Sequence, residues 1–122
     1  MHRRRGVTIG DHVYIGQRCA IDNAYPEYVY IEDNVSLAGG VMVIAHANPY
    51  KHFRNVVDSS VAPIVIKEGA WIGEGAILLR GVTIGKNAIV SAGTMVDKDV
   101  PDNSIAKGNP MKIVADFSAL ID

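Results

Sequence analysis

Several features that stabilise or target other proteins are scarce in this chain of 122 residues. Its one cysteine, Cys19, has no second cysteine with which to form an internal disulfide. A net charge of −1 gives no global attraction to nucleic acid or acidic membranes, so neither is expected as a partner. No apolar run approaches the roughly 20 residues of a spanning helix, and the N-terminus has no apolar segment resembling a signal peptide. A cytoplasmic location is therefore expected.

What the chain does contain is a repeat of six residues, clearest between Ile64 and Val96. A period of six fits neither an α-helix, at 3.6 residues, nor a plain strand alternation, at 2. It is the hexapeptide pattern of a parallel β-helix, in which three hexads, about 18 residues, close one triangular coil and the next coil stacks on it at about 4.8 Å. The inward positions are Ile66, Ile72, Leu78, Ile84, Val90 and Val96.

The same register occurs nearer the N-terminus. Each inward residue has a small or β-branched residue two places before it, a position that Cys19 occupies ahead of Ile21, so Cys19 is either a small core residue or a reactive thiol. Because each coil buries its faces only against its neighbours, four to five coils alone would be marginally stable, and oligomerisation is expected. The additional inward positions are Ile9, Ile15, Ile21, Ile31, Leu37 and Val43.

Two breaks interrupt the repeat. Four extra residues bulge out within Asp22 to Tyr28, and a longer excursion, Ala45 to Pro63, separates the second coil from the third. A long segment without repeat character inside a compact solenoid is usually functional. This one carries His46 and His52, and histidine is the side chain suited to removing a proton from a hydroxyl or amine near neutral pH.

The two ends of the chain lie outside the regular repeat. The basic run Arg3 to Arg5 is either a solvated edge of the first coil or a contact to a phosphate or acidic acceptor. Near the C-terminus, apolar residues have helical spacing after Asn109-Pro110, which predicts a packing helix over about 110–121. The chain is thus expected to be one all-β domain, 1–122, with coils at about 5–44 and 64–106, a loop at 45–63 and a short C-terminal α-helix.

Several motifs resemble one known family. The hexads, the WIG of residues 71–73, the GVTIG of 81–85, the VSAGTMVDKDVP of 90–101 and the GNPMK of 108–112 are similar to the hexapeptide-repeat acyltransferases, especially the maltose, galactoside and nodulation-type O-acetyltransferases and related polysaccharide enzymes. This resemblance implies a left-handed parallel β-helix, a homotrimer with sites between subunits, and acetyl-CoA as acyl donor. It also implies a hydroxyl or amino group of a sugar or glycan-type acceptor, and no metal.

The resemblance also implies roles for particular residues. His46 matches the general base, with His52 as the alternative, and Trp71 matches the tryptophan near the thiol end of the cofactor. Ala92 lies where backbone groups bind the pantetheine arm, whereas Lys98 and Lys112 match cationic positions that meet the nucleotide phosphates. Trp71 could instead be a corner aromatic residue that only packs, and each of the two lysines could be a solvated surface residue.

Two other functions are compatible with the repeat. Some hexapeptide folds are zinc hydratases resembling γ-type carbonic anhydrase, and this chain has four histidines, at positions 2, 12, 46 and 52. A third ligand on a neighbouring coil face is missing from the sequence pattern, which disfavours zinc. A β-helix scaffold that binds partners without chemistry is the other alternative.

Overall fold

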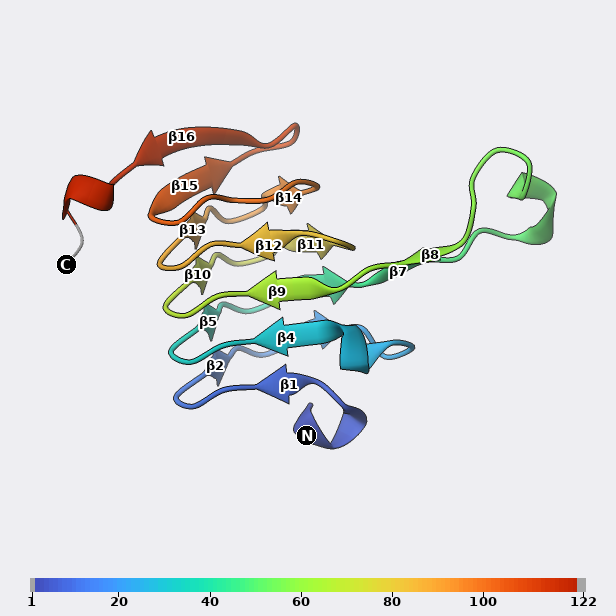
Figure 1. Ribbon diagram of the computed structural model, residues 1–122, viewed down its shortest axis with the longest axis horizontal. Helices are drawn as coiled ribbons and strands as arrows, with labels where there is room; N and C mark the ends of the chain where they lie inside the picture. Colours follow the sequence, from blue (N-terminus) through green and yellow to red (C-terminus); the bar gives the residue numbers. More distant parts are fainter. Residues whose placement is uncertain (1, 121–122) are drawn as a thin grey trace.

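The structure is a computed structural model that describes residues 2–120. The chain winds through three sheets in turn, and strands from successive coils pair in parallel within each sheet (Figure 1). The first sheet contains β1 (Thr8–Ile9), β4 (Val29–Ile31), β9 (Ile64–Ile66) and β12 (Thr83–Ile84). The second contains β2 (Tyr14–Ile15), β5 (Ser36–Leu37), β10 (Trp71–Ile72), β13 (Ile89–Val90), β15 (Ser104–Lys107) and β16 (Lys112–Asp116). The third contains β3 (Ala20–Ile21), β6 (Met42–Ile44), β11 (Ile77–Leu79) and β14 (Met95–Val96).

Aliphatic side chains stack along the inside of this winding, as the six-residue period predicts. Ile31 pairs with Ile66, and Leu37 pairs with Ile72, so equivalent hexad residues lie directly above one another. Most of the inward side chains are buried, but Ile9 and Ile15 are only partly buried. They belong to the first coil, where a neighbouring coil covers only one side within the described residues.

Gly73 lies where the backbones of two stacked coils come close together. A glycine after an inward isoleucine is expected to ease the bend of the chain, yet Gly73 does not have a positive φ. Instead, a Cβ at Gly73 would lie 2.6 Å from the amide nitrogen of Ala92 in the next coil. Glycine therefore permits two stacked backbones to approach closely at this corner.

The prediction of a C-terminal α-helix is wrong. Residues Lys112–Asp116 form strand β16, which pairs antiparallel with β15, and only a short 3-10 turn, Ser118–Leu120, follows. The turn at 108–111 reverses the chain, and the segment then pairs with the open edge of β15, with one register shift between Ile105 and Ala106. β-Branched Ile113 and Val114 suit a strand, so tertiary pairing outweighs the helical spacing of the apolar residues. Ile121, part of the predicted helix, lies outside the described residues.

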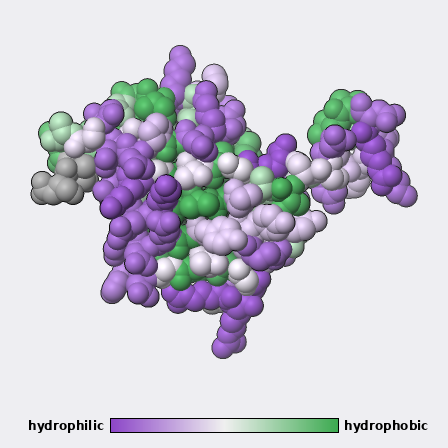
Figure 2. Space-filling view, in the orientation of Figure 1, coloured by the Kyte–Doolittle hydropathy of each residue, from purple (hydrophilic) through white to green (hydrophobic). Residues whose placement is uncertain are grey.

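The excursion between the second and third coils projects from the stack as a ribbon. Its base is the antiparallel pair β7 (His46–Ala47) and β8 (Ser60–Val61), and a 3-10 turn, Lys51–Phe53, lies near its tip. Figure 2 shows the ribbon standing clear of the body with hydrophobic surface at its end, where Phe53, Val56 and Val57 are exposed. Two shorter 3-10 turns occur at Arg3–Arg5 and Pro26–Tyr28. In the described part of the chain, no helix has the length and apolar character needed to cross a membrane.

Candidate active site

The candidate site lies where the ribbon leaves the stack. Strands β3 and β6 pair in parallel, with Ile21 beside Val43, so the segments that follow these strands emerge at the same corner. Asp22 directly follows β3, and His46 opens β7 shortly after β6. Stacking of two coils therefore joins residues that are 24 positions apart in the sequence.

Asp22 and His46 form a close pair. The Nδ1 atom of His46 lies 2.6 Å from Oδ2 of Asp22. The Asp22 side chain is fully buried, whereas the His46 side chain is 28% exposed. The inner member of the pair is thus sealed in the protein, and the imidazole is left accessible from outside.

Backbone amides hold the Asp22 carboxylate in place. The amides of Ala24 and Tyr25 donate to Oδ1 at 2.9 and 2.8 Å, and the amide of Ala45 donates to Oδ2 at 2.7 Å. Burial raises the pKa of Asp22, but the hydrogen bonds from Tyr25, His46, Ala45 and Ala24 outweigh it and lower the pKa below its ordinary value. The carboxylate is therefore ionised at neutral pH.

An ionised Asp22 fixes the tautomer of His46. A carboxylate only accepts hydrogen bonds, so the Nδ1 atom of His46 must carry the hydrogen. The Nε2 atom of a neutral imidazole then has a free lone pair and can accept a proton. Tyr25 packs beside the imidazole, with ring centroids 5.4 Å apart, and restricts its orientation.

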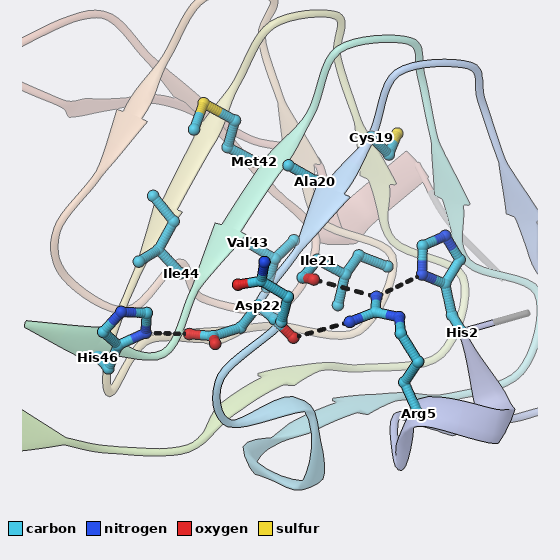
Figure 3. Close-up of a pocket in the computed structure, with 11 residues that line it drawn as sticks. His2, Arg5, Cys19, Ala20, Ile21, Asp22, Met42, Val43, Ile44 and His46 are labelled. Atoms are coloured by element: carbon cyan, nitrogen blue, oxygen red, sulfur yellow. Dashed lines mark hydrogen bonds and ion pairs between the residues drawn. The ribbon is translucent and has the colours of Figure 1, made fainter.

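A pocket of about 550 Å³ adjoins this pair (Figure 3). One wall is apolar, formed by β3 and β6 with Met42 and Ile44, and Cys19 also lines the pocket. The Cys19 thiol is half-buried, packs against the core and donates to the Ala38 carbonyl at 3.1 Å. His2 and Arg5 lie on the side of Asp22 away from His46.

His52, the alternative base, is placed elsewhere. It lies in the exposed 3-10 turn of the ribbon and stacks on Phe53 with ring centroids 4.1 Å apart. No carboxylate within residues 2–120 forms an ion pair with it. Of the two loop histidines, only His46 thus has a partner that fixes its tautomer.

Trp71 and Ala92 share a second pocket, of about 410 Å³, on the sheet that contains β10 and β13. Trp71 is 55% exposed and points outward from the stack. Among the backbone hydrogen bonds within residues 2–120, none uses the amide or carbonyl of Ala92. Both backbone groups are available to a ligand in this pocket.

The two lysines matched by the resemblance lie away from this pocket's lining. Lys98 follows β14 at an exposed corner, and Lys112 begins β16, where it is exposed opposite Lys107. Residues of one chain thus supply His46 in one pocket and Trp71 with Ala92 in another. The structure does not bring all of the predicted site residues together within a single chain.

Zinc ligands do not gather in the described residues. No group of three or more histidine, cysteine, aspartate or glutamate side chains is arranged to hold a metal ion within 2–120. The hydratase alternative therefore has no ligand set within one described chain.

Asp22 is the residue that the sequence did not single out. The sequence pattern marked Asp22 only as the first residue of a bulge, although the sequence contains one signal that could have identified it as a site residue. An acidic residue directly after an inward strand residue, one coil before a loop histidine, will reach the same corner whenever the two coils stack in parallel.

Comparisons with known proteins agree with the repeat and the winding. The family model described as bacterial transferase hexapeptide (six repeats) matches residues 63–98, and that described as hexapeptide repeat of succinyl-transferase matches residues 6–45. Galactoside O-acetyltransferase of Escherichia coli is 33% identical over 113 residues, covering 92% of this chain and 55% of that protein. The chain spans about half the length of the curated relatives it matches.

Solved structures show the same similarity. A hexapeptide-repeat acetyltransferase of Vibrio cholerae, solved in complex with acetyl-coenzyme A, aligns with a TM-score of 0.81 at 28% identity, covering 96% of this chain and 62% of that one. A maltose O-acetyltransferase of Clostridium difficile aligns with a TM-score of 0.74 at 27% identity, covering 94% of this chain and 72% of that one.

Proposed function

Because the chain belongs to the hexapeptide-repeat transferases, we propose that it transfers an acetyl group from acetyl-CoA to a hydroxyl or amino group of a sugar or glycan-type acceptor. Transfer to oxygen is favoured, since the galactoside and maltose relatives are named as O-acetyltransferases. The observation that carries the proposal is the buried Asp22 carboxylate paired with the accessible imidazole of His46.

His46 acts as the general base in this reaction. Its Nε2 atom takes the proton of the acceptor hydroxyl while the hydroxyl oxygen attacks the carbonyl carbon of the thioester. The tetrahedral intermediate collapses as the carbon–sulfur bond breaks, and the proton passes from His46 to the departing thiolate. The products are the acetyl ester and free CoA, and no covalent enzyme intermediate is needed because the thioester is already activated.

Asp22 assists as a positioning residue. It holds the hydrogen on Nδ1 and stabilises the imidazolium that forms when Nε2 takes the proton. A backbone amide or a side chain of an adjoining subunit donates to the oxyanion of the tetrahedral intermediate.

The donor binds along the face that carries Trp71. The free amide and carbonyl of Ala92 hydrogen-bond the pantetheine arm, and Trp71 packs near its thiol end. Lys98 and Lys112 meet the nucleotide phosphates as point charges. This arrangement is supported by the Vibrio cholerae acetyltransferase, whose structure was solved in complex with acetyl-coenzyme A.

A homotrimer of left-handed β-helices completes the site. Within one chain, the pocket of His46 and the pocket of Trp71 share no lining residue. A neighbouring copy is therefore needed to bring its Trp71 pocket next to the His46 pocket of the first copy. The apolar outer side chains of Trp71, Met42 and Tyr30 are exposed in the single chain and supply surface for such an interface.

A test of the function is an acceptor screen with acetyl-CoA. Purified protein is incubated with acetyl-CoA and a panel of sugars, amino sugars and nucleotide sugars, and released thiol and acetylated product are measured together. Acceptor-dependent thiol release is expected, together with the mass increase that results when one acetyl group replaces a hydrogen of the acceptor. Tight acetyl-CoA binding without turnover on any acceptor would contradict the proposal and favour a binding scaffold.

A further inference from the structure

Arg5 lines the His46 pocket and reaches the backbone at the end of β3, where Asp22 follows the strand. Its Nη2 atom donates to the carbonyl of Ile21 at 3.1 Å, and its Nη1 atom donates to the carbonyl of Asp22 at 3.2 Å. Figure 3 shows Arg5 and His46 on opposite sides of Asp22. Arg5 and His46 thus both contact Asp22: the guanidinium contacts its backbone carbonyl, and the imidazole contacts its carboxylate.

The charge of Arg5 has no carboxylate partner in the described residues. The ion pairs found within 2–120 are His46 with Asp22 and Lys86 with Glu68. Although Asp22 is adjacent, its carboxylate is held by His46 and three backbone amides, and only its carbonyl accepts from Arg5. A partly buried cation without a counter-charge is costly, and a bound anion would offset that cost.

Arg5 also keeps donors free. A guanidinium has five N–H donors, and contacts to His2, Ile21 and Asp22 use three of them in the described residues. The two that remain, on Nε and Nη1, lie on different edges of the guanidinium, so each can donate one charge-assisted hydrogen bond to a carboxylate or a phosphate.

His2 adds a neutral donor beside the guanidinium. Its Nδ1 atom lies 2.7 Å from Nη2 of Arg5, and because arginine only donates, Nδ1 accepts and the ring hydrogen is on Nε2. Burial and the adjacent charge of Arg5 lower the pKa of His2, which keeps the ring neutral at pH 7. The cluster therefore offers one positive charge together with an additional N–H.

We propose that Arg5 binds an anionic group of the acceptor, a carboxylate or a phosphate, while a hydroxyl of the same molecule meets His46. This inference rests on the proposed acetyl transfer and names its acceptor class as acidic or phosphorylated sugars. A neutral sugar would fill the apolar part of the pocket but would leave the guanidinium without its counter-charge.

Matched acceptors test this directly. Glucose, glucuronic acid and glucose 6-phosphate, and the corresponding galactose series, differ at one carbon in carrying no charge, a carboxylate or a phosphate. We expect kcat/KM for at least one anionic member to exceed that of its neutral parent by about tenfold or more, which is the size of one charge-assisted contact. Which anionic member responds distinguishes a carboxylate from a phosphate.

Variants of Arg5 test the residue. Arg5→Gln should abolish the preference through KM, and Arg5→Lys should retain part of it. Arg3→Gln is the matched control, because Arg3 also donates to two backbone carbonyls, of Ile9 and Gly10, but does not line the pocket. It should leave the preference intact.

Two results would overturn the inference: equal turnover of neutral and anionic acceptors by the wild-type protein, or an unchanged preference in Arg5→Gln. Calorimetric binding of the same sugars separates this failure from failure of the proposed function. If no acceptor is turned over, the proposed acetyl transfer is contradicted. Even then, the anion site is supported if the protein binds an anionic sugar and Arg5→Gln weakens that binding about tenfold. If Arg5→Gln does not fold, loss of the wild-type preference at high ionic strength supports the inference, and a salt-independent preference contradicts it.

Discussion

The Nδ1 atom of His46 lies 2.6 Å from a carboxylate oxygen of Asp22, a residue from the preceding coil. This contact fixes which nitrogen of the imidazole carries hydrogen and leaves the other free to accept a proton. Replacing His46 with alanine should therefore lower kcat by about 100-fold or more with little change in acetyl-CoA affinity. Steady-state kinetics and calorimetry measure the two quantities, and His52→Ala, on the exposed turn, is the control that should retain activity. Near-normal turnover by His46→Ala would remove His46 as the base.

Asp22→Asn tests the positioning of the imidazole. An amide can present its oxygen to only some of the four donors that surround Asp22, and it cannot stabilise an imidazolium by charge. We expect kcat to fall by about tenfold or more, with a changed pH profile of kcat/KM, while the KM for acetyl-CoA stays near the wild-type value. A purely structural role would instead reduce the amount of active protein and leave the pH profile unaltered.

The same residue links stability to pH. Because the folded protein lowers the pKa of Asp22, the unfolded chain binds this proton more tightly than the folded one does. The stabilisation is thus fully present above the ordinary value of 3.8 and is lost as pH falls through the lower, folded-state pKa. Urea unfolding of wild type and Asp22→Asn should show a difference in free energy of unfolding that shrinks below about pH 4. A difference independent of pH would contradict this account.

Trp71→Ala tests the donor pocket. The indole is more than half exposed, so its removal should change thermal stability little but weaken acetyl-CoA binding by about tenfold, the size of a lost aromatic contact. Calorimetric titration and thermal unfolding measure both effects. Tyr14→Ala, which removes another exposed aromatic residue from the same sheet, is the matched control. Equal affinities in wild type and Trp71→Ala would place the donor elsewhere.

Lys98 and Lys112 separate nucleotide binding from acetyl transfer. If they meet the phosphates, Lys98→Gln and Lys112→Gln should each raise KM for acetyl-CoA several-fold, and raised salt should reduce the effect. Neither variant should alter KM for acetyl-pantetheine, which lacks the nucleotide. Equal losses with both donors would instead indicate a change in the fold of the site.

Gly73→Ala tests the close stacking of two coils. The added Cβ would meet the amide nitrogen of Ala92 at 2.6 Å, so the coils must separate, at an expected cost of about 1–3 kcal/mol in free energy of unfolding. Gly75→Ala is a comparison without a clash, since nothing lies within 4 Å of its Cβ, although its positive φ should cost about 1 kcal/mol. Denaturant unfolding of both variants measures how much each one loses in free energy of unfolding. A smaller loss for Gly73→Ala than for Gly75→Ala would contradict the stacking argument.

The amino-acid sequence by itself determined the winding, because a six-residue period of aliphatic side chains has only one regular way to be buried. It also marked the ribbon and His46, since the period stops abruptly where the chain leaves the stack. Tertiary structure decided the remainder. β16 replaced the predicted helix because the edge of β15 offered it hydrogen bonds, which no local pattern records. Likewise, Asp22 and Arg5 reach the site because stacked coils align distant segments, and that alignment exists only once the chain has folded.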